Sequence, residues 1–347
     1  MSKLAGRRLW FVGIGGAGLS GYAAVARAWG AEVGGWDRVE TPYLRQLEGV
    51  DVRISPEPEA PDGWEAVVST AYAGRVSGRS RAEFLAEMVS LQRSIVVAGA
   101  HGKTTTTGMI AFVLDRLGRD PSFLVGGDVP QLDGNARAGE GWLARAPQAV
   151  RGWELEPVAF PLAVAGEHNR RNAATALAAL ELAGVARADA EPLLAEFAGA
   201  GRRLERRGQA RGVTVLDTYA HHPAEIAADL QAVREQGAGR VLVLFQPHLY
   251  SRTRHLAREF GTALAAADAV AVADVYPARE DPVTGVSGKL IVDAAAETRP
   301  GFPLAWTPDP ADGARWLAGR ARSGDTVLTV GAGDVDLAAD VVLDALG

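Results

Sequence analysis

The stretch that decides the fold is LWFVGIGGAGLSGYAAVARAWGAEVGGWD, at residues 9–37. A short apolar run leads through glycines into a helical pattern and then into a second strand-like run. That order predicts a βαβ unit with parallel strands. Gly13, Gly15 and Gly18 have the G-x-G-x-x-G spacing of loops that bring the backbone close to a pyrophosphate at a helix N-terminus. Asp37 follows where an acid that binds a ribose is expected, although a glycine turn needed only for packing is the alternative.

A second glycine loop follows in SIVVAGAHGKTTTTG, at residues 94–108. The pattern predicts a buried strand at 94–98, a phosphate-binding loop, and a helix. The loop would use Gly99, Ala100, His101, Gly102, Lys103, Thr104 and Thr105. Its backbone N–H groups would surround the phosphates of ATP, and Lys103 would neutralise their charge. The hydroxyl of Thr104 or of Thr105 would bind Mg²⁺, and Thr104 is the residue that we assign to the metal.

The second loop departs from G-x-x-x-x-G-K-[ST], because Val97 stands where the first glycine is expected. The alternative is a threonine-rich helix start with a solvated lysine. Two phosphate-type loops favour a ligase or a kinase over a dehydrogenase, which would need only the first loop.

Apolar strand-like runs alternate with helical patterns through the rest of the chain, which predicts an α/β fold with parallel sheets. Residues 172–197 are expected to form two helices with a break at 184–187, and four strand-like runs follow. We expect three domains: a Rossmann-like domain at 1–94, a shortened P-loop ATPase domain at 95–198 and a Rossmann-like domain at 199–347.

Composition narrows the class of protein. The 347 residues carry a net charge of −6 and no cysteine, which excludes disulfides, thiolate metal sites and thiol nucleophiles. The uncharged stretch 9–26 contains five glycines, so a strand, a turn and a helix are expected there in place of a membrane span. We therefore expect a cytoplasmic protein with no nucleic-acid or membrane partner, and the sequence leaves its oligomeric state open.

Several clusters of polar residues lie in the second half of the sequence. They are GEHNRRNAATALAAL from 166, AGRRLERRG from 200, LDTYAHHPAEI from 216, FQPHLYSRTRHL from 245, DVYPAREDPVTGVSG from 274 and GAGDV from 331. With the two loops, they follow the order of motifs in the Mur ligase family, which this chain resembles along its whole length. The resemblance is strongest to members that join L-alanine to UDP-N-acetylmuramate.

The resemblance implies the roles of individual residues. The UDP-sugar site would contain Gly15, Ala17, Gly18, Ser20, Asp37, Ser69 and Thr70. The ATP site would add His168, Asn169 and Asn172 to the loop, with Lys103 and Arg203 as the catalytic cations. His248 and Arg252 would face the amino acid. Without the resemblance, a helix cap is favoured over ligand binding for His168. The arginines near 203 could equally form a solvated charge run, and His221 and His222 a turn before a helix.

The implied reaction is ATP-dependent ligation of L-alanine to UDP-N-acetylmuramate through an acyl phosphate, in peptidoglycan precursor synthesis. A recycling ligase that attaches a ready-made peptide to the same sugar nucleotide is a close variant. However, only 61 residues separate Thr107 from His168, and two acidic stretches of the family are missing there. Thr218 also replaces a family aspartate. The alternative is therefore a catalytically impaired relative that binds nucleotide or UDP-sugar as a regulatory or interaction module.

Overall fold

The computed structural model describes residues 3–99, 101–141, 150–278 and 280–347. The chain forms two compact units: the first is Met1–Val164 with Asn169–Gly201, and the second is Ala165–His168 with Arg202–Gly347. The three-domain division at 94 and 198 is finer than this one and stays a prediction. None of the helices in the described ranges is both long enough and apolar enough to cross a membrane.

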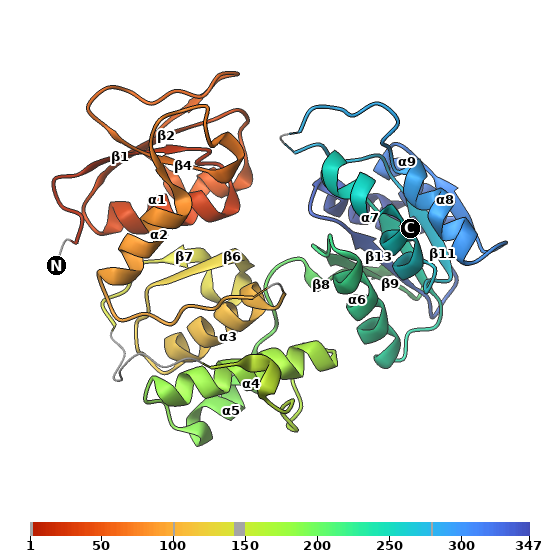
Figure 1. The fold of residues 1–347 in the computed structure, drawn as a ribbon. Coiled ribbons are helices and arrows are strands. Elements are labelled where there is room, and N and C mark those ends of the chain that lie inside the picture. Colours follow the sequence, from red (N-terminus) through yellow and green to blue (C-terminus); the bar gives the residue numbers. More distant parts are fainter. Residues whose placement is uncertain (1–2, 100, 142–149, 279) are drawn as a thin grey trace. The chain divides into compact units, whose positions relative to one another are not determined.

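The first unit opens with a five-stranded parallel sheet in the order β3-β2-β1-β4-β5 (Figure 1). Its strands are β1 (Arg8–Val12), β2 (Glu32–Asp37), β3 (Asp51–Ile54), β4 (Glu65–Val68) and β5 (Arg79–Ser80). Helix α1 (Ala17–Ala28) joins β1 to β2, which confirms the βαβ unit expected at 9–37. Helix α2 (Arg81–Ser90) follows β5 and begins with a capping box made by Ser80 and Glu83.

Strand β1 is buried on both faces, as expected for a central parallel strand. Leu9 and Phe11 belong to the core beneath α1 and α2, whereas Trp10 and Val12 belong to a second core on the opposite face. This double burial fixes where β1 ends, and so fixes the position of the glycine loop that follows it.

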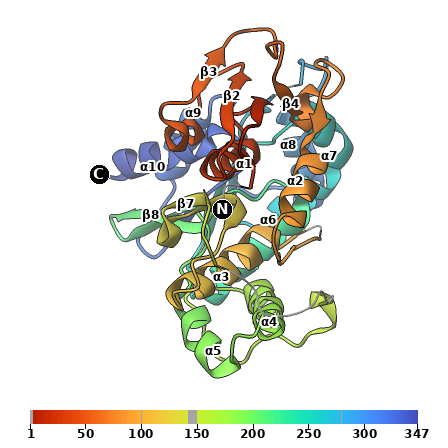
Figure 2. The ribbon, with the colours of Figure 1, turned by 90° about the vertical axis from the view of Figure 1, so that its left-hand side faces the viewer.

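The rest of the first unit is mostly helical. It contains α3 (Lys103–Arg116), the antiparallel pair β6 (Phe123–Val129) and β7 (Gly134–Arg137), α4 (Glu167–Leu182) and α5 (Arg187–Glu196). The pair β6–β7 packs against α1, while α4 and α5 lie on the side of α3 away from the first sheet (Figures 1 and 2). One apolar core joins α3, β6, α4 and α5. The two helices predicted at 172–197 are confirmed, and the break between them lies at 183–186.

The prediction of a strand at 94–98 is wrong. The helix at 103 starts as expected, but residues 94–98 pair with no strand in the described ranges. The physical reason is that a strand exists only beside another strand, and the described residues of this region supply just one two-stranded sheet, β6–β7.

The second unit is a six-stranded sheet in the order β12-β11-β10-β13-β9-β8, parallel except for β8. Its strands are β8 (Arg203–Ala210), β9 (Val213–Thr218), β10 (Val241–Phe245), β11 (Ala269–Val272), β12 (Leu304–Trp306) and β13 (Thr326–Val330). One core holds side chains of α6 (Pro223–Glu235), α7 (Tyr250–Leu264) and α8 (Lys289–Thr298). Another holds those of α9 (Pro310–Ala318) and α10 (Ala338–Leu346).

The four predicted strands of this unit are confirmed as β9, β10, β11 and β13. Sequence reasoning missed β8, whose arginines read as a solvated run, and the three-residue β12. Short 3₁₀ turns complete the chain: η1 (Pro42–Leu47), η2 (Thr70–Tyr72), η3 (Pro130–Leu132), η4 (Gly152–Glu154) and η5 (Asp334–Leu337).

Candidate functional site

The first candidate site lies at the carboxyl ends of β1 and β4. In the order β3-β2-β1-β4-β5 the chain leaves β1 toward β2, while β4 lies on the opposite side of β1. Such a topological switch point opens a crevice where ligands bind in α/β sheets. The loop after β1 carries Gly13 and Gly15, and Ser69 and Thr70 follow β4 directly. The structure therefore brings these predicted residues to one edge.

The glycine loop is held in shape by a buried carboxylate. Asp37, only 3% exposed, accepts hydrogen bonds from the backbone N–H of Gly15 at 2.8 Å and from that of Arg38 at 2.7 Å. The hydroxyl of Thr41 donates to the carbonyl oxygen of Gly15 at 2.7 Å. A Cβ atom at Gly15 would lie 2.9 Å from Oδ2 of Asp37, so the close approach requires glycine there. Asp37 thus positions the loop, and its predicted contact with a ribose stays a prediction.

The start of α1 is also tied to the β6–β7 pair. Asn135, which is buried, donates a hydrogen bond from Nδ2 to the carbonyl oxygen of Ala17 at 2.5 Å, and the Ser20 hydroxyl donates to the same oxygen at 3.3 Å. The guanidinium of Arg81 lies 3.0 Å from where a Cβ at Gly18 would stand. Sequence reasoning missed Thr41, Asn135 and Arg81, because each is brought to the loop only by the tertiary fold.

The second glycine loop ends at the N-terminus of α3. Gly102 has a φ of +79° and is the cap residue, and Lys103 is the first residue of the helix. The Lys103 ammonium donates a hydrogen bond to the carbonyl oxygen of Gly99 at 2.6 Å. Thr104 is half-buried, and its hydroxyl lies 3.0 Å from where a Cβ at Gly126 would stand. A helix N-terminus with a lysine in its first turn suits a phosphate anion.

One residue from α4, Asn172, lies against this loop. A Cβ at Gly102 would stand only 2.3 Å from Oδ1 of Asn172, so the side chain of Asn172 occupies the space beside the loop. Asn172 donates a hydrogen bond from Nδ2 to Oδ1 of Asn169 at 3.3 Å. The structure therefore brings Asn172 to the loop, as predicted, with Asn169 hydrogen-bonded to it. Of the predicted ATP-binding residues, Ala100 lies outside the described residues.

The described residues do not form a complete metal site. They contain no group of three or more histidine, aspartate or glutamate side chains that could hold a metal ion. The hydroxyl of Thr104 is one oxygen ligand, whereas Mg²⁺ takes six in an octahedral arrangement, several of them water. No chemical step can therefore be assigned to a metal from these residues.

Two of the predicted ATP-site residues belong to the second unit. His168 is largely buried, and its pKa is lowered by that burial and by the charge of Arg203. A histidine with a lowered pKa is neutral near pH 7 and keeps an acceptor nitrogen. Arg203 lies 4.0 Å from Glu225 and 6.0 Å from the Tyr219 ring centroid, and neither contact fully occupies its donors.

A second arginine organises the carboxyl ends of the strands in this unit. Arg202 donates from Nε to Oδ2 of Asp217 at 2.8 Å, from Nη1 to the carbonyl oxygen of Gly333 at 2.8 Å, and from Nη2 to that of Gly331 at 2.7 Å. Burial nevertheless raises the pKa of Asp217, although Arg202 and the Thr329 hydroxyl stabilise its charged form. Arg202 thus joins the ends of β9 and β13, which are neighbours in the sheet.

Thr218, which replaces a family aspartate, has a defined partner. Its hydroxyl donates to Oδ2 of Asp229 at 2.6 Å. Burial raises the pKa of Asp229 to about 6, and that hydrogen bond from Thr218 opposes the shift. The pair is buried, so the carboxylate that the family motif would supply at 218 would have to share this space with Asp229.

The predicted amino-acid-facing residues lie at one end of the same sheet. His248 follows β10 and stacks on Tyr276, with ring centroids 5.8 Å apart, while the ring of His221 lies 6.2 Å from that of His248. Arg252 donates to the carbonyl oxygen of His221 at 3.5 Å. Burial lowers the pKa of His221. The structure brings His221, His248 and Arg252 together, and sequence reasoning had left His221 open.

Comparisons with known proteins match both units. Residues 8–93 match the family described as Mur ligase family, catalytic domain, and residues 202–333 match Mur ligase, glutamate ligase domain. A protein of Renibacterium salmoninarum named UDP-N-acetylmuramate–L-alanine ligase is 37% identical, with 98% of this chain and 96% of that protein covered. A protein of Streptomyces coelicolor with the same name is 34% identical, with 97% of each chain covered.

Among solved structures, the UDP-N-acetylmuramate–alanine ligase of Thermotoga maritima has a TM-score of 0.73 at 22% identity, covering 97% of this chain and 98% of that one. A murein peptide ligase of Psychrobacter arcticus has a TM-score of 0.66 at 20% identity, covering 99% of each chain. These two similarities are evidence of a shared fold.

The length of the alignment also shows that this chain is shorter than its relatives. The alignment with the Renibacterium protein spans 452 positions, which is 105 more than the 347 residues of this chain, so at least that many positions of the relative face gaps. Two matched domains and relatives above 30% identity over nearly its whole length establish that this chain belongs to the Mur ligase family.

Proposed function

We propose that the protein catalyses the ATP-dependent ligation of L-alanine to UDP-N-acetylmuramate, a step of peptidoglycan precursor synthesis. The observation that carries the proposal is the similarity, over nearly the whole chain, to relatives with that named activity. The two glycine loops, His248 and Arg252 are the positions that we expect to serve this reaction. ATP and UDP-sugars are cytoplasmic metabolites, so the proposal places the protein in the cytoplasm.

The reaction needs positioning and charge stabilisation more than an enzyme nucleophile. A substrate carboxylate oxygen attacks the γ-phosphorus of ATP, which forms an acyl phosphate and releases ADP. The amine of alanine then attacks the acyl carbon, loses a proton and displaces inorganic phosphate. Lys103 and Arg203 are the cations that would stabilise the transferred phosphoryl group. Thr104 and a divalent ion would complete the nucleotide site, with the remaining ligands unassigned.

The role of Lys103 requires one exchange of partners. Its ammonium binds the carbonyl oxygen of Gly99, which belongs to the same loop. An incoming phosphate oxygen carries more negative charge than a carbonyl oxygen, so it competes well for this donor. The hydrogen bond to Gly99 thereby keeps the Lys103 ammonium close to where the phosphates would bind.

The test is release of inorganic phosphate, measured with each substrate omitted in turn. We expect release only when UDP-N-acetylmuramate, L-alanine, ATP and Mg²⁺ are all present, and a loss of at least about 100-fold in Lys103→Ala. The matched control is Lys289→Ala, which removes an exposed lysine paired with Asp293 in the second unit. Replacing L-alanine with a murein tripeptide distinguishes synthesis from recycling.

A second candidate is a relative that binds UDP-sugar or nucleotide without turnover. It is favoured by the 105 or more missing positions and by the incomplete metal site among the described residues. Titration calorimetry with UDP-N-acetylmuramate separates the two. Binding together with phosphate release no higher than that of Lys103→Ala would reject the ligase proposal and support the second candidate.

A further inference from the structure

The two residues predicted to face the amino acid, His248 and Arg252, include no carboxylate. In the proposed reaction the substrate is an α-amino acid, which carries both a carboxylate and an ammonium group. Arg252 suits the carboxylate, because a guanidinium and a carboxylate form charge-assisted hydrogen bonds. An ammonium group needs an acceptor of opposite charge, so a carboxylate side chain is the partner to look for.

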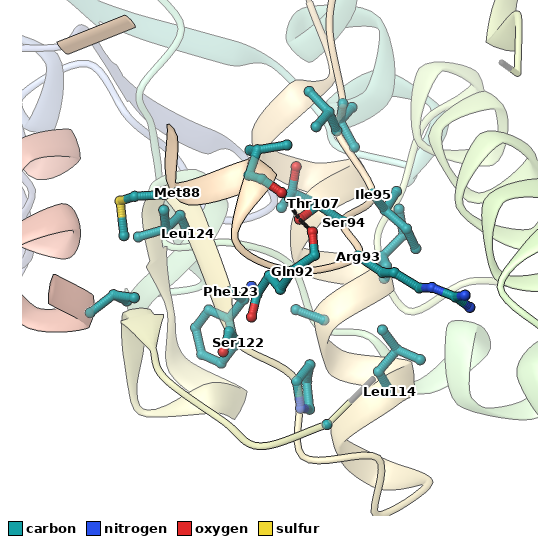
Figure 3. Close-up of a pocket in the computed structure, with 18 of the residues that line it drawn as sticks. Met88, Gln92, Arg93, Ser94, Ile95, Thr107, Leu114, Ser122, Phe123 and Leu124 are labelled. Carbon is teal, nitrogen blue, oxygen red and sulfur yellow. Dashed lines mark hydrogen bonds between the residues drawn. The ribbon is translucent and has the colours of Figure 1, made fainter. Parts of the chain in front are cut away.

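The apolar cavity of the first unit does not supply such a partner. Its volume is about 220 Å³, and Figure 3 shows Met88, Leu114 and Phe123 among the side chains around it, together with the cation of Arg93. No aspartate or glutamate is among the described residues that line it. An ammonium group placed there would lose its hydration without meeting an opposite charge, which is unfavourable. The carboxylate is therefore expected in the second unit, beside His248.

The second unit has a topological switch point at the carboxyl ends of β10 and β13. The chain leaves β10 toward β11, while β13 lies on the opposite side of β10. Ligands bind in the crevice at such points of α/β sheets. Residues 246–248 follow β10, and residues 331–334 follow β13. The backbone N–H of Gln246 donates to the carbonyl oxygen of Val330 at 2.9 Å, so the two loops begin side by side.

Asp334 lies at this switch point and is held by a buried amide. Gln246 donates a hydrogen bond from Nε2 to Oδ1 of Asp334 at 2.9 Å. Asp334 itself is exposed, whereas Gln246 is only 5% exposed. A Cβ at Gly333 would stand 2.5 Å from Cγ of Tyr276, whose ring stacks on that of His248. The residue before Asp334 thus packs on the ring beside His248, so the carboxylate lies at the edge predicted to hold the amino acid.

The Gln246 amide gives up one hydrogen bond to hold this carboxylate. Its Oε1 is buried and has no hydrogen-bond partner among the described residues. A buried acceptor without a donor is destabilising and rare in folded proteins. The reverse orientation of the amide would aim Oε1 at the Asp334 carboxylate, where two acceptors would repel each other. Only the orientation that binds Asp334 avoids this repulsion, and it leaves Oε1 unsatisfied.

Two other carboxylates in this part of the unit are already engaged. Glu280 accepts hydrogen bonds from the backbone N–H of Ser251, at 2.8 Å, and from the hydroxyl of the same residue. Glu225 accepts a hydrogen bond from the backbone N–H of His221 at 3.1 Å. Within the described ranges, Oδ2 of Asp334 takes part in no hydrogen bond or ion pair. It is the carboxylate oxygen that stays available to a ligand.

Given the proposed function, on which this role rests, we propose that the Asp334 carboxylate binds the ammonium group of the amino-acid substrate while Arg252 binds its carboxylate. Oδ2 accepts a charge-assisted hydrogen bond from the ammonium group, and Gln246 keeps Oδ1 in place. The contact selects α-amino acids, and peptides with a free N-terminal amine, over acids of the same shape that have no amine.

The test is equilibrium dialysis with radiolabelled L-alanine, in the presence of UDP-N-acetylmuramate and a non-hydrolysable ATP analogue. Asp334→Asn keeps an oxygen for the Gln246 amide and removes the charge. We expect its dissociation constant for L-alanine to rise at least about tenfold. The matched control is Asp340→Asn, because Asp340 is an exposed aspartate of α10 that pairs with Arg207 on the surface. That variant should bind L-alanine as the wild type does.

Propionate separates recognition of the amine from a general change of the site. It has the carboxylate and the carbon chain of alanine but no amine. Measured as a competitor of L-alanine, it should therefore have the same inhibition constant for the wild type and for Asp334→Asn. The proposal is overturned if Asp334→Asn weakens propionate as much as L-alanine, or if it leaves the affinity for L-alanine unchanged.

Phosphate release by the wild-type protein reports separately on the proposed function. If L-alanine binds more weakly to Asp334→Asn but no phosphate is released, the role of Asp334 stands and the ligase proposal fails. If phosphate is released and Asp334→Asn binds L-alanine as tightly as the wild type, the ligase proposal stands and the role of Asp334 fails. A wild-type protein that binds no L-alanine overturns both.

Discussion

The carboxylate of Asp37 lies 2.8 Å from the backbone nitrogen of Gly15 and accepts its hydrogen bond, so the end of β2 fixes the loop that follows β1. The other oxygen of the carboxylate accepts from the N–H of Arg38. An acid that is expected to contact a ribose therefore also shapes the loop at the pyrophosphate. Binding of the UDP-sugar and the shape of the loop should respond to the same substitutions.

Gly15→Ala should weaken UDP-sugar binding. The added Cβ would stand 2.9 Å from Oδ2 of Asp37 and 3.1 Å from the Thr41 hydroxyl, so the loop must move away from Asp37. We expect the dissociation constant for UDP-N-acetylmuramate to rise at least about tenfold, measured by titration calorimetry. Gly319→Ala is the control, since the nearest atom to its Cβ would be at an ordinary 3.5 Å. Unchanged affinity in Gly15→Ala would place the UDP-sugar elsewhere.

Gly102→Ala should weaken nucleotide binding through a clash with Asn172. The added Cβ would stand 2.3 Å from Oδ1 of Asn172, and φ at Gly102 is +79°. Gly301→Ala has the same backbone strain, with a φ of +80°, but no atom within 4 Å of its Cβ. Strain alone costs about 1 kcal/mol.

The two variants therefore separate the clash from the strain. We expect the affinity for ATP, followed by fluorescence of a labelled analogue, to fall at least about tenfold in Gly102→Ala and to stay at the wild-type value in Gly301→Ala. The double variant Gly102→Ala with Asn172→Ala removes the clash and should recover part of the loss of affinity only if Asn172 itself contributes little to binding. Wild-type affinity in Gly102→Ala would show that the loop does not bind the phosphates.

The pH dependence of stability should reveal the buried carboxyl of Asp229. Burial raises its pKa from 3.8 to about 6, so folding favours the protonated form. The stability that this group contributes is complete below pH 3.8 and is lost as the pH rises through 6. Asp229→Asn keeps an acceptor for the Thr218 hydroxyl and cannot ionise. Between pH 4.5 and pH 7.5, the unfolding free energy of the variant should therefore gain about 2 kcal/mol relative to the wild type.

Urea unfolding at the two pH values measures this difference. Glu225 and Arg203 also affect Asp229 electrostatically, so the comparison is repeated in high salt, where the surface contributions shrink and that of the buried carboxyl persists. A difference between variant and wild type that is the same at both pH values would contradict the raised pKa.

Local sequence patterns predicted most of the secondary structure. The βαβ unit at 9–37, the helix after Lys103 and strands β9, β10, β11 and β13 follow from periodicity and glycine placement. The failures have one cause, which is that pairing is not a local property. The run SIVVA at 94–98 has every strand signal and yet pairs with no described strand, whereas the arginine-rich β8 forms a strand because β9 is beside it.

The same distinction between local and long-range contacts applies to the candidate sites. Motif spacing alone predicts that Gly15 and Lys103 lie in loops at the start of a helix, and the structure has both residues there. Thr41, Asn135 and Arg202 reach their partners across 26, 118 and 131 residues of sequence, and no spacing rule connects such positions. Their contacts arise from the sheet order and from the packing of β6–β7 on α1.

Arg202→Lys should destabilise the second unit, even though the charge is kept. The guanidinium of Arg202 binds Asp217 and the carbonyl oxygens of Gly331 and Gly333 with three different nitrogens. A lysine ammonium is a single point and cannot reach all three acceptors. Asp217 is fully buried, so a weaker partner leaves its buried charge poorly compensated, which destabilises the folded state. We expect the unfolding free energy to fall by about 2–3 kcal/mol.

The matched control is Arg207→Lys, because Arg207 pairs with Asp340 on the surface, where the aspartate side chain is 63% exposed. That variant should stay within about 0.5 kcal/mol of the wild type in urea unfolding. If Arg202→Lys were equally mild, the three hydrogen bonds would not be holding β9 and β13 together at their carboxyl ends. His248 and Arg252, which are predicted to face the amino acid, would then owe their position to the apolar core beneath them and not to this arginine.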